Sequence, residues 1–298
     1  MLSILIPTYH YNAFPLVEML QKQATALGII YEIIVSDDAS TDNEILERNK
    51  LIASLEYCQF YHQKNNLGRG ENRNRLCQMA QYDWLLFLDC DTIPVRENFL
   101  KNYVNSIEKN QFQAVFGGIA YQENPPEKQA MLRWIYGRNR EAVPLEKRKR
   151  KPYESSLVSN LLIRKNLLLS YPFHPKIYDY GFEDFVFIAD LKKNKIQIEQ
   201  MDNAVYHLNL ESSSVFLEKH LRALSNLNQL INQGIIPADA TTIGKTRAIL
   251  KRFWLDRLMV KLFHRLEPSL KKNLLSDVPS LQQFYLYKLG YFCALKSL

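Results

Sequence analysis

The chain has 298 residues, of which 47% are hydrophobic, 12% aromatic and 23% charged, and its formal net charge is +7. It can bury a substantial core as one large domain or as a domain with an appendage, and no run approaches the roughly 18 apolar residues that a membrane span needs. The positive charge fits a partner that carries negative charge, which includes a nucleotide, a nucleic acid and an anionic membrane.

Four scattered cysteines lack the spacing of a metal site: Cys58, Cys77, Cys90 and Cys293. Cys58 and Cys90 fall in or beside apolar segments, which indicates reduced core thiols of a cytosolic protein. The apolar segment 1–7 is too short for a signal peptide and has no basic flank. We therefore expect a cytoplasmic protein that is either soluble or peripheral on the cytoplasmic face of the membrane.

Strands and helices alternate through the first 120 residues. Short apolar runs predict buried strands, and apolar residues at helical spacing predict helices. The expected strands are 2–6, 31–35, 57–61, 84–88 and 114–119, and the expected helices are 13–27, 43–54, 71–80 and 97–109. Ser40 or Thr41 is the expected cap of the second helix. Repeated β-α-β units predict a doubly wound, mostly parallel sheet flanked by helices.

The alternation stops near Tyr121. We expect a helix at 128–137, apolar segments at 157–164, 182–191 (a helix) and 204–208 (a strand), and then helices at 215–233, 246–265 and 281–295. The basic run 146–151 is either a solvated loop or a mobile lid that touches phosphates.

The helix 246–265 interleaves basic and apolar residues, so it either lies on an anionic bilayer or packs on the main domain with a basic outer face. We expect a catalytic domain at 1–210, with halves at about 1–120 and 121–210, and a helical extension at 211–298.

Asp89-Cys90-Asp91 directly follows the buried strand 84–88. Ligands of open α/β sheets bind beyond the carboxyl ends of the strands, and two carboxylates there can hold a hard divalent cation that in turn holds phosphates. A solvated turn is the alternative interpretation of this triplet alone.

Five short motifs lie in order at strand ends or nearby turns. They are Ile6-Pro7-Thr8-Tyr9, Asp37-Asp38-Ala39-Ser40-Thr41-Asp42, Asn66-x-Gly68-x-x-x-x-Arg73-Asn74, Asp89-Cys90-Asp91 and Gly181-Phe182-Glu183-Asp184. The ordered set resembles the inverting, nucleotide-sugar-dependent glycosyltransferases of family 2, over roughly residues 2–210. The resemblance implies a GT-A fold, with the C-terminal helices as an extension.

The resemblance implies how a UDP-sugar donor is bound. A backbone edge and an aromatic ring at Pro7, Thr8 and Tyr9 would hold the base, and Asp38 would accept a hydrogen bond from uracil. The remaining donor-binding candidates are Asn66, Gly68, Arg73, Asp89 and Asn160, the last beside the donor sugar. Arg73 reaches either the base or the diphosphate, or it is a helix-surface residue paired with Asp38.

The same resemblance implies the chemistry. Asp91 would bind Mn²⁺ or Mg²⁺ directly, with Asp89 on the ribose or on metal-bound water, and His207 is either a third ligand or structural. Asp184 would be the general base of an inverting displacement, with Glu183 orienting hydroxyl groups. The alternative for both acids is an ordinary helix N-terminus.

Two positions depart from the family pattern. Ala39 stands where the family usually has Gly, which matters only if that position needs a positive φ. Cys90 stands in the middle of the metal motif, and its side chain is expected to point back toward the sheet.

We therefore expect a metal-dependent, inverting, hexosyltransferase-like enzyme of polysaccharide biosynthesis that uses a UDP-sugar, with a glycan or lipid-linked glycan as acceptor. Basic C-terminal helices could contact the membrane peripherally, and we expect no nucleic acid partner. A sugar-phosphate nucleotidyltransferase should have a Gly-rich loop after the first strand, where this chain has Pro7-Thr8-Tyr9-His10. A nucleic-acid-binding module would not gather acids at strand ends, because they repel phosphates.

Overall fold

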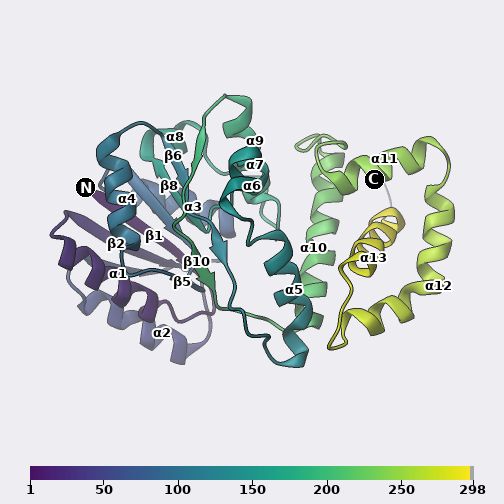
Figure 1. Ribbon diagram of the computed structural model, residues 1–298, viewed down its shortest axis with the longest axis horizontal. Helices are drawn as coiled ribbons and strands as arrows, with labels where there is room; N and C mark the ends of the chain where they lie inside the picture. Colours follow the sequence, from purple (N-terminus) through teal and green to yellow (C-terminus); the bar gives the residue numbers. More distant parts are fainter. Residues whose placement is uncertain (296–298) are drawn as a thin grey trace. The chain divides into compact units, whose positions relative to one another are not determined.

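The computed structural model describes residues 1–295, which form two compact units (Figure 1). The first unit contains Met1–Tyr121, Glu141–Tyr178 and Glu183–Asn209. The second contains Gln122–Arg140, Asp179–Phe182 and the segment from Leu210 onward. The chain passes from the first unit to the second near residue 210, where a boundary was expected. It also does so at two earlier places, because residues 122–140 and 179–182 belong to the second unit.

A seven-stranded sheet forms the centre of the first unit, with the strand order β3-β2-β1-β4-β8-β6-β9 (Figure 1). All strands are parallel except β8, which runs antiparallel to β4 and β6. The sheet is thus mostly parallel, as predicted. Its strands are β1 (Leu2–Thr8), β2 (Tyr31–Asp37), β3 (Cys58–His62), β4 (Trp84–Leu88), β6 (Ala114–Phe116), β8 (Asn160–Arg164) and β9 (Ile198–Gln200).

A second sheet of three short strands has the order β5-β10-β7. These strands are β5 (Thr92–Pro94), β10 (Val205–His207) and β7 (Ile119–Ala120). The predicted single strand 114–119 is wrong, because the chain turns at Gly117 and Gly118 and passes from one sheet to the other. Gly118 has φ +99°, which a residue with a Cβ rarely adopts. In this sheet His207 pairs with Thr92, one residue after Asp91.

Helices flank the central sheet. Those at 14–27, 43–54, 69–79, 99–109 and 183–193 lie within a few residues of the predicted helices, whereas the three short helices between residues 145 and 170 were not predicted. The helical elements of this unit are α1 (Phe14–Leu27), α2 (Asn43–Lys50), η1 (Leu51–Ser54), α3 (Arg69–Met79), α4 (Phe99–Lys109), α6 (Leu145–Arg150), α7 (Pro152–Ser155), α8 (Lys165–Ser170) and α9 (Glu183–Lys193). The predicted cap of α2 is wrong. Asp42, not Ser40 or Thr41, caps that helix by accepting a hydrogen bond from the backbone N–H of Ile45 at 3.1 Å.

The basic run 146–151 is not a solvated loop, because most of it forms α6 and Arg148 is buried. The Arg148 guanidinium donates to the main-chain carbonyls of Phe116 (3.3 Å) and Met201 (2.9 Å) and to the side chain of Gln200 (3.0 Å). Arginine has five N–H donors, so one side chain can satisfy several buried carbonyls. Arg148 therefore ties α6 to the region where β6 and β9 end.

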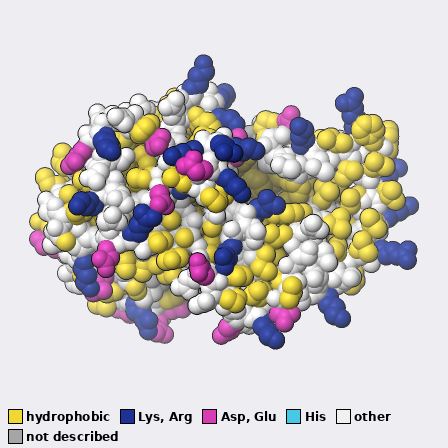
Figure 2. All heavy atoms as spheres, viewed as in Figure 1, with side chains coloured by type: hydrophobic (Ala, Val, Ile, Leu, Met, Phe, Trp, Pro, Cys, Tyr) yellow, Lys and Arg dark blue, Asp and Glu magenta, His cyan; other side chains and the backbone are white. Residues whose placement is uncertain are grey.

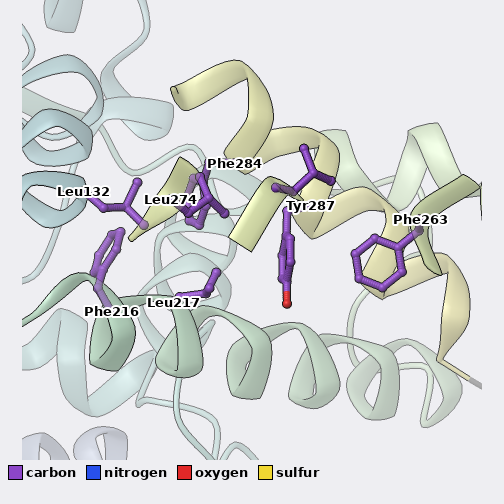
Figure 3. Packing of buried hydrophobic residues seen from close by; sticks show 8 residues of the cluster. Leu132, Phe216, Leu217, Phe263, Leu274, Phe284 and Tyr287 are labelled. Atoms are coloured by element: carbon purple, nitrogen blue, oxygen red, sulfur yellow. The ribbon is translucent and has the colours of Figure 1, made fainter. Parts of the chain in front are cut away.

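The second unit is helical. Its elements are η2 (Lys128–Ala130), α5 (Met131–Arg140), α10 (Ser213–Asn232), α11 (Thr242–Arg252), α12 (Asp256–Leu274) and α13 (Leu281–Ala294). Its core holds aromatic and leucine side chains from α5, α10, α12 and α13 (Figure 3), namely Leu132, Phe216, Leu217, Phe263, Leu270, Leu274, Phe284 and Tyr287.

The predicted helix 246–265 is interrupted at Phe253–Leu255, where Trp254 has φ +59°. Two shorter helices, α11 and α12, therefore replace one long helix. In the part of the chain that the structure describes, no helix combines the length and apolar character needed to span a bilayer.

Candidate active site

The sheet order places three of the predicted motifs side by side, because β1 lies between β2 and β4. Parallel strands end at the same edge, so Thr8, Asp37 and the start of the Asp89 motif follow neighbouring strand ends. The backbone N–H of Asp38 donates to the carbonyl of Thr8 at 2.9 Å, which joins the first two motifs directly.

Asp38 holds the turn that precedes α3. Its carboxylate accepts hydrogen bonds from the backbone N–H groups of Leu67 (2.6 Å) and Gly68 (3.0 Å), and Asn66 Nδ2 donates to its carbonyl at 2.9 Å. Burial raises the pKa of Asp38, while the two backbone donors oppose that shift. The predicted residues Asp38, Asn66 and Gly68 therefore contact one another, and the hydrogen bonds of Asp38 fix the turn.

Gly68 cannot readily be replaced in this turn. It has φ +80°, and a Cβ there would lie 3.0 Å from the carbonyl oxygen of Tyr178. The turn thus needs a residue without a side chain on both conformational and steric grounds.

Asp37 is fully buried and organises the loop after β2, in agreement with its interpretation as a turn residue. Its carboxylate accepts from the backbone N–H and the hydroxyl of Ser40, at 2.8 and 2.6 Å, and contacts His62 Nδ1 at 2.8 Å. The hydroxyl of Ser40 also accepts from the backbone N–H of His10 at 2.7 Å. Ala39 within this loop has φ +64°, so the departure from Gly falls at a position that does need a positive φ.

The end of β1 presents an exposed aromatic ring. Thr8 is buried and its hydroxyl donates to the carbonyl of Tyr11 at 3.0 Å, whereas Tyr9 is 53% exposed. The Tyr9 ring makes an edge contact with the ring of His10, with 4.3 Å between centroids. Pro7 is half-buried in the same strand. The open face of Tyr9 is available for stacking on a flat ligand.

Arg73 gathers the acids of two distant motifs. The guanidinium lies 2.8 Å from Asp89 Oδ1, 3.2 Å from Asp184 Oδ1 and 4.0 Å from Glu183 Oε1, and its side chain is buried. Arg69, one turn earlier on α3, lies 3.8 Å from Glu183. The expected alternative, a surface Arg73 paired with Asp38, is therefore wrong.

Asp89 and Asp184 differ in protonation behaviour. Burial opposes the ionisation of both, but Arg73, Arg69 and His207 together hold the pKa of Asp89 below its usual range. For Asp184, burial outweighs the attraction of Arg73, and repulsion from Glu183 and Asp89 adds to it, which raises the pKa to about 6. A carboxylate with such a pKa is ionised at neutral pH and binds a proton more readily than an ordinary aspartate does.

The segment that carries Asp184 has an unusual backbone. Gly181 and Phe182 have φ +93° and +72°, and α9 begins at Glu183 directly after them. The backbone N–H of Val158 donates to Asp184 Oδ2 at 3.3 Å. Within the second unit, Asn226 Nδ2 donates to the carbonyl of Gly181 at 2.9 Å, with further contacts to those of residues 179 and 180. A bulky residue in the left-handed region is strained, so the surrounding contacts must fix this turn.

Asp91 and His207 lie close together at the edge of the small sheet. Asp91 Oδ2 is 3.5 Å from His207 Nε2, and the His207 ring stacks on Tyr121 with 5.6 Å between centroids and 12° between planes. A carboxylate oxygen and an imidazole nitrogen suit Mn²⁺, which leaves other positions to phosphate oxygens and water. One carboxylate oxygen of Asp89 accepts a hydrogen bond from Arg73 at 2.8 Å. Among residues 1–295, no group of three or more His, Cys, Asp or Glu is placed to hold a metal ion, and Asp91 and His207 form a pair of possible donors.

Two further ionisable side chains, those of Tyr11 and Cys90, interact electrostatically with Asp91. Burial and the nearby Asp91 raise the pKa of Tyr11 to about 12, and this residue belongs to none of the five motifs because it lies beyond the first of them. Burial raises the pKa of the Cys90 thiol to about 12, and Asp91 adds to this shift. The Cys90 thiol is therefore protonated at physiological pH.

Asn160 is placed differently from the other donor-binding candidates. It is fully buried, its Oδ1 accepts from the Tyr103 hydroxyl at 2.7 Å, and its Nδ2 donates to the carbonyls of Gly118 (2.8 Å) and Asn203 (2.9 Å). These bonds join β8 to the turn between β6 and β7. Both amide protons are used within the protein, so the observed role of Asn160 is structural.

The chain is similar in sequence to known glycosyltransferases. The family model described as glycosyl transferase family 2 matches residues 3–163. An uncharacterised glycosyltransferase of Mycoplasma pneumoniae is 29% identical over 119 residues, which cover 38% of this chain and 39% of that protein. One of Haemophilus influenzae is 29% identical over 141 residues, which cover 43% of this chain and 45% of that protein. The chain thus matches less than half the length of these relatives.

Solved structures share the fold. Glucosyl-3-phosphoglycerate synthase of Mycobacterium tuberculosis, solved with Mn²⁺, UDP and glucosyl-3-phosphoglycerate, superposes with a TM-score of 0.52 at 21% identity, covering 80% of this chain and 81% of that one. Residues 1–349 of TarS from S. aureus, solved with UDP-GlcNAc, give a TM-score of 0.51 at 17% identity, covering 98% and 89%. The mixed sheet and its flanking helices therefore form a GT-A fold. Because the family model covers more than half of the chain, the protein belongs to glycosyl transferase family 2.

Proposed function

We propose that this family 2 glycosyltransferase moves a sugar from a UDP-sugar to a hydroxyl group of a glycan or a lipid-linked glycan, with inversion at the anomeric carbon. The observation that carries the proposal is the convergence of Asp89 and Asp184 on Arg73. Such a cluster supplies a carboxylate with a raised pKa beside a second, ionised carboxylate, as acid–base chemistry requires.

The donor nucleotide would bind along the ends of β1 and β2. Tyr9 offers its open ring to the base, and the main chain of Pro7 and Thr8 offers a polar edge. Asp38 acts by fixing the turn at Gly68 against Thr8, because its carboxylate is engaged by two backbone donors. The UDP and UDP-GlcNAc present in the two solved relatives support a uridine nucleotide as the donor carrier.

Asp91 and His207 would hold a divalent ion, Mn²⁺ or Mg²⁺, with Asp89 next to them. When bound, the ion supplies positive charge that stabilises the departing diphosphate. The M. tuberculosis relative was solved with Mn²⁺, which supports this assignment. Tyr121 keeps the His207 ring in one orientation through the stacking contact.

Asp184 would act as the general base. As the acceptor oxygen attacks the anomeric carbon, the new C–O bond forms while the bond from that carbon to the diphosphate oxygen breaks, and UDP leaves with the electron pair. The acceptor proton passes to Asp184, so charge and atoms balance in a single inverting displacement. Arg73 holds the Asp184 carboxylate, and Glu183 is placed beside it to orient hydroxyl groups.

The compartment is proposed on chemical grounds. All four cysteines are free thiols in the structure, which supports a reducing, cytoplasmic location for polysaccharide biosynthesis from a nucleotide sugar.

A direct test measures UDP release from a panel of UDP-sugars with Mn²⁺ and a glycan acceptor. Asp184→Asn should keep the donor dissociation constant and lose about 10²–10⁴-fold in kcat, the usual contribution of a general base. Asp190→Asn, on the same helix, is the matched control and should keep full activity. Equal loss of donor binding and turnover in Asp184→Asn would show that Asp184 is structural and would refute its role as base.

A further inference from the structure

The corner between α11 and α12 exposes large apolar side chains. Phe253 and Trp254 are 64% and 77% exposed, and Leu258, in the first turn of α12, is 62% exposed. Trp254 is the most exposed large apolar side chain among residues 1–295. We call the set the corner surface, and it comprises Ile249, Phe253, Trp254, Leu255, Leu258 and Leu262. Such a cluster at one point of a helical unit is the mark of an interaction site.

Basic side chains border the corner surface in a regular pattern. On α12, Arg257, Lys261 and Arg265 recur every four residues, and the first two directly precede the leucines at 258 and 262. Residues four apart lie on one stripe of a helix, so a basic stripe runs beside the apolar one. The side chains of the stripe are exposed, and Figure 2 shows dark blue groups projecting among yellow ones along the outer edge of this unit.

The charge around the corner is predominantly positive. The exposed basic residues between positions 244 and 265 are Lys245, Lys251, Arg252, Arg257, Lys261 and Arg265, and the single acidic residue there is Asp256. Arg247, in the same range, is buried and donates to Asn228 Oδ1 at 2.6 Å. The surface therefore attracts an anionic partner over a distance comparable to the Debye length.

Trp254 has a backbone conformation that is unfavourable for a residue with a Cβ. Its φ of +59° is in the left-handed region, where helices usually end in Gly or Asn. The side chain gains no compensating burial within the chain, because most of its surface is exposed. Strained residues cluster at functional sites such as ligand-binding and switch regions.

A second copy of the chain fits this surface poorly. A two-fold symmetric contact centred on the corner surface would place the basic stripes of both copies in one interface, with Asp256 as the single acidic residue of residues 244–265 to offset them. An anionic bilayer fits both features, because apolar and aromatic side chains enter the headgroup region while Lys and Arg contact the lipid phosphates.

We propose that the corner surface binds peripherally to an anionic lipid bilayer. Phe253, Trp254 and Leu258 enter the interface, and the stripe of Arg257, Lys261 and Arg265 contacts the headgroups. The contact is independent of sugar transfer, so it can be tested without donor or acceptor. It would place the enzyme at the surface where a lipid-linked acceptor resides.

The test is co-sedimentation of the full chain with vesicles. Wild type should bind vesicles of equimolar phosphatidylcholine and phosphatidylglycerol, should not bind pure phosphatidylcholine, and should lose binding as salt rises. Trp254→Gly should bind about tenfold more weakly because one large apolar side chain no longer enters the bilayer. It should fold normally, because Gly adopts this φ without strain.

A charge variant and a control complete the experiment. Arg257→Glu combined with Lys261→Glu should weaken binding about 25-fold or more, since each cation near an anionic surface contributes about fivefold. Val278→Ser, which changes another highly exposed apolar side chain of the same unit, should bind as wild type. Equal binding to neutral and anionic vesicles, or unchanged binding of Trp254→Gly, would overturn the proposal. So would a lipid-free dimer that Trp254→Gly abolishes, because the occupant would then be a second copy.

Discussion

Arg73 donates to Asp184 at 3.2 Å although 111 residues separate the two in the chain. The same guanidinium reaches Asp89 at 2.8 Å, so one buried cation faces the acids of two motifs. Without it, Asp89, Glu183 and Asp184 would form a cluster of like charges in a partly buried site. This contact links the donor side of the proposed site to its base.

Arg73→Met should therefore destabilise the protein and shift its pH profile. Removing one partner of a buried ion pair costs about 3–5 kcal/mol, and the uncompensated acids would raise the pKa of Asp184 further. We expect a lower Tm and an acid limb of kcat/KM displaced to higher pH. Arg75→Met, at an exposed position on the same helix, should change neither quantity. An acid limb at the same pH as in the wild type would mean that Arg73 does not affect the pKa of the base.

The proposed role of Asp184 as base predicts the pH dependence of the wild-type enzyme. Only the ionised base accepts a proton, so kcat/KM should fall about tenfold per pH unit below about pH 6. Asp184→Asn should lose most of its activity, and its residual kcat/KM should not fall below pH 6. A profile that stays flat down to pH 5 would contradict the assignment.

The same raised pKa has a consequence for stability. The folded protein binds the Asp184 proton more tightly than the unfolded chain does, so this contribution is complete below the ordinary value of 3.8 and is lost as pH rises through about 6. Asp184→Asn, which is neutral at every pH, should therefore be more stable than wild type at pH 7, by about 1–3 kcal/mol. Urea unfolding at pH 7 and pH 4 measures this, and the difference should shrink at the lower pH.

Ala39→Gly should stabilise the protein. Ala39 has φ +64°, which costs a residue with a Cβ about 1–2 kcal/mol, while Gly has a larger entropy loss on folding. The net gain should be up to about 1 kcal/mol in the free energy of unfolding. Ala26→Gly, at an exposed position in α1, is the opposite control and should cost about 1 kcal/mol. A destabilised Ala39→Gly would mean that the Ala methyl group makes a needed contact.

Metal and nucleotide should stabilise the fold together. Mn²⁺ and UDP added jointly should raise the Tm of wild type by more than the sum of their separate effects, because each completes the other's site. Asp91→Asn and His207→Ala should each abolish the joint effect. His174→Ala, at a partly exposed histidine outside the cluster, should retain it. A full joint effect in Asp91→Asn would remove Asp91 from the proposed ligands.

The sheet and the place of the motifs could be predicted because both depend on local pattern. Apolar runs such as Trp84–Leu88 are buried along their whole length, and in a doubly wound sheet their carboxyl ends meet at one edge. The five motifs therefore identified the family, which excludes a nucleotidyltransferase and a nucleic-acid-binding module as the class of the protein.

Contacts between distant segments could not be predicted in the same way. The small sheet unites β5, β7 and β10, each of two or three residues, which is too short for a periodic signal. Arg148 lies in a basic run that was expected to be a loop or lid, and Arg73 was left open between a ligand-binding residue and a surface residue. Sequence alone does not show which carbonyls or acids pack around a guanidinium. Asn160 matched a family segment, but its amide joins β8 to the turn between β6 and β7.

The strained turn before Asp184 has a consequence for how the protein can be shortened. Its carbonyls accept hydrogen bonds from Asn226, which comes from α10 in the C-terminal half of the chain. A truncated chain ending at residue 209 would keep every proposed catalytic side chain and lose that anchor. We expect the turn before Asp184, the proposed base, to loosen in such a fragment, so the fragment should lose activity although its proposed catalytic side chains are all present.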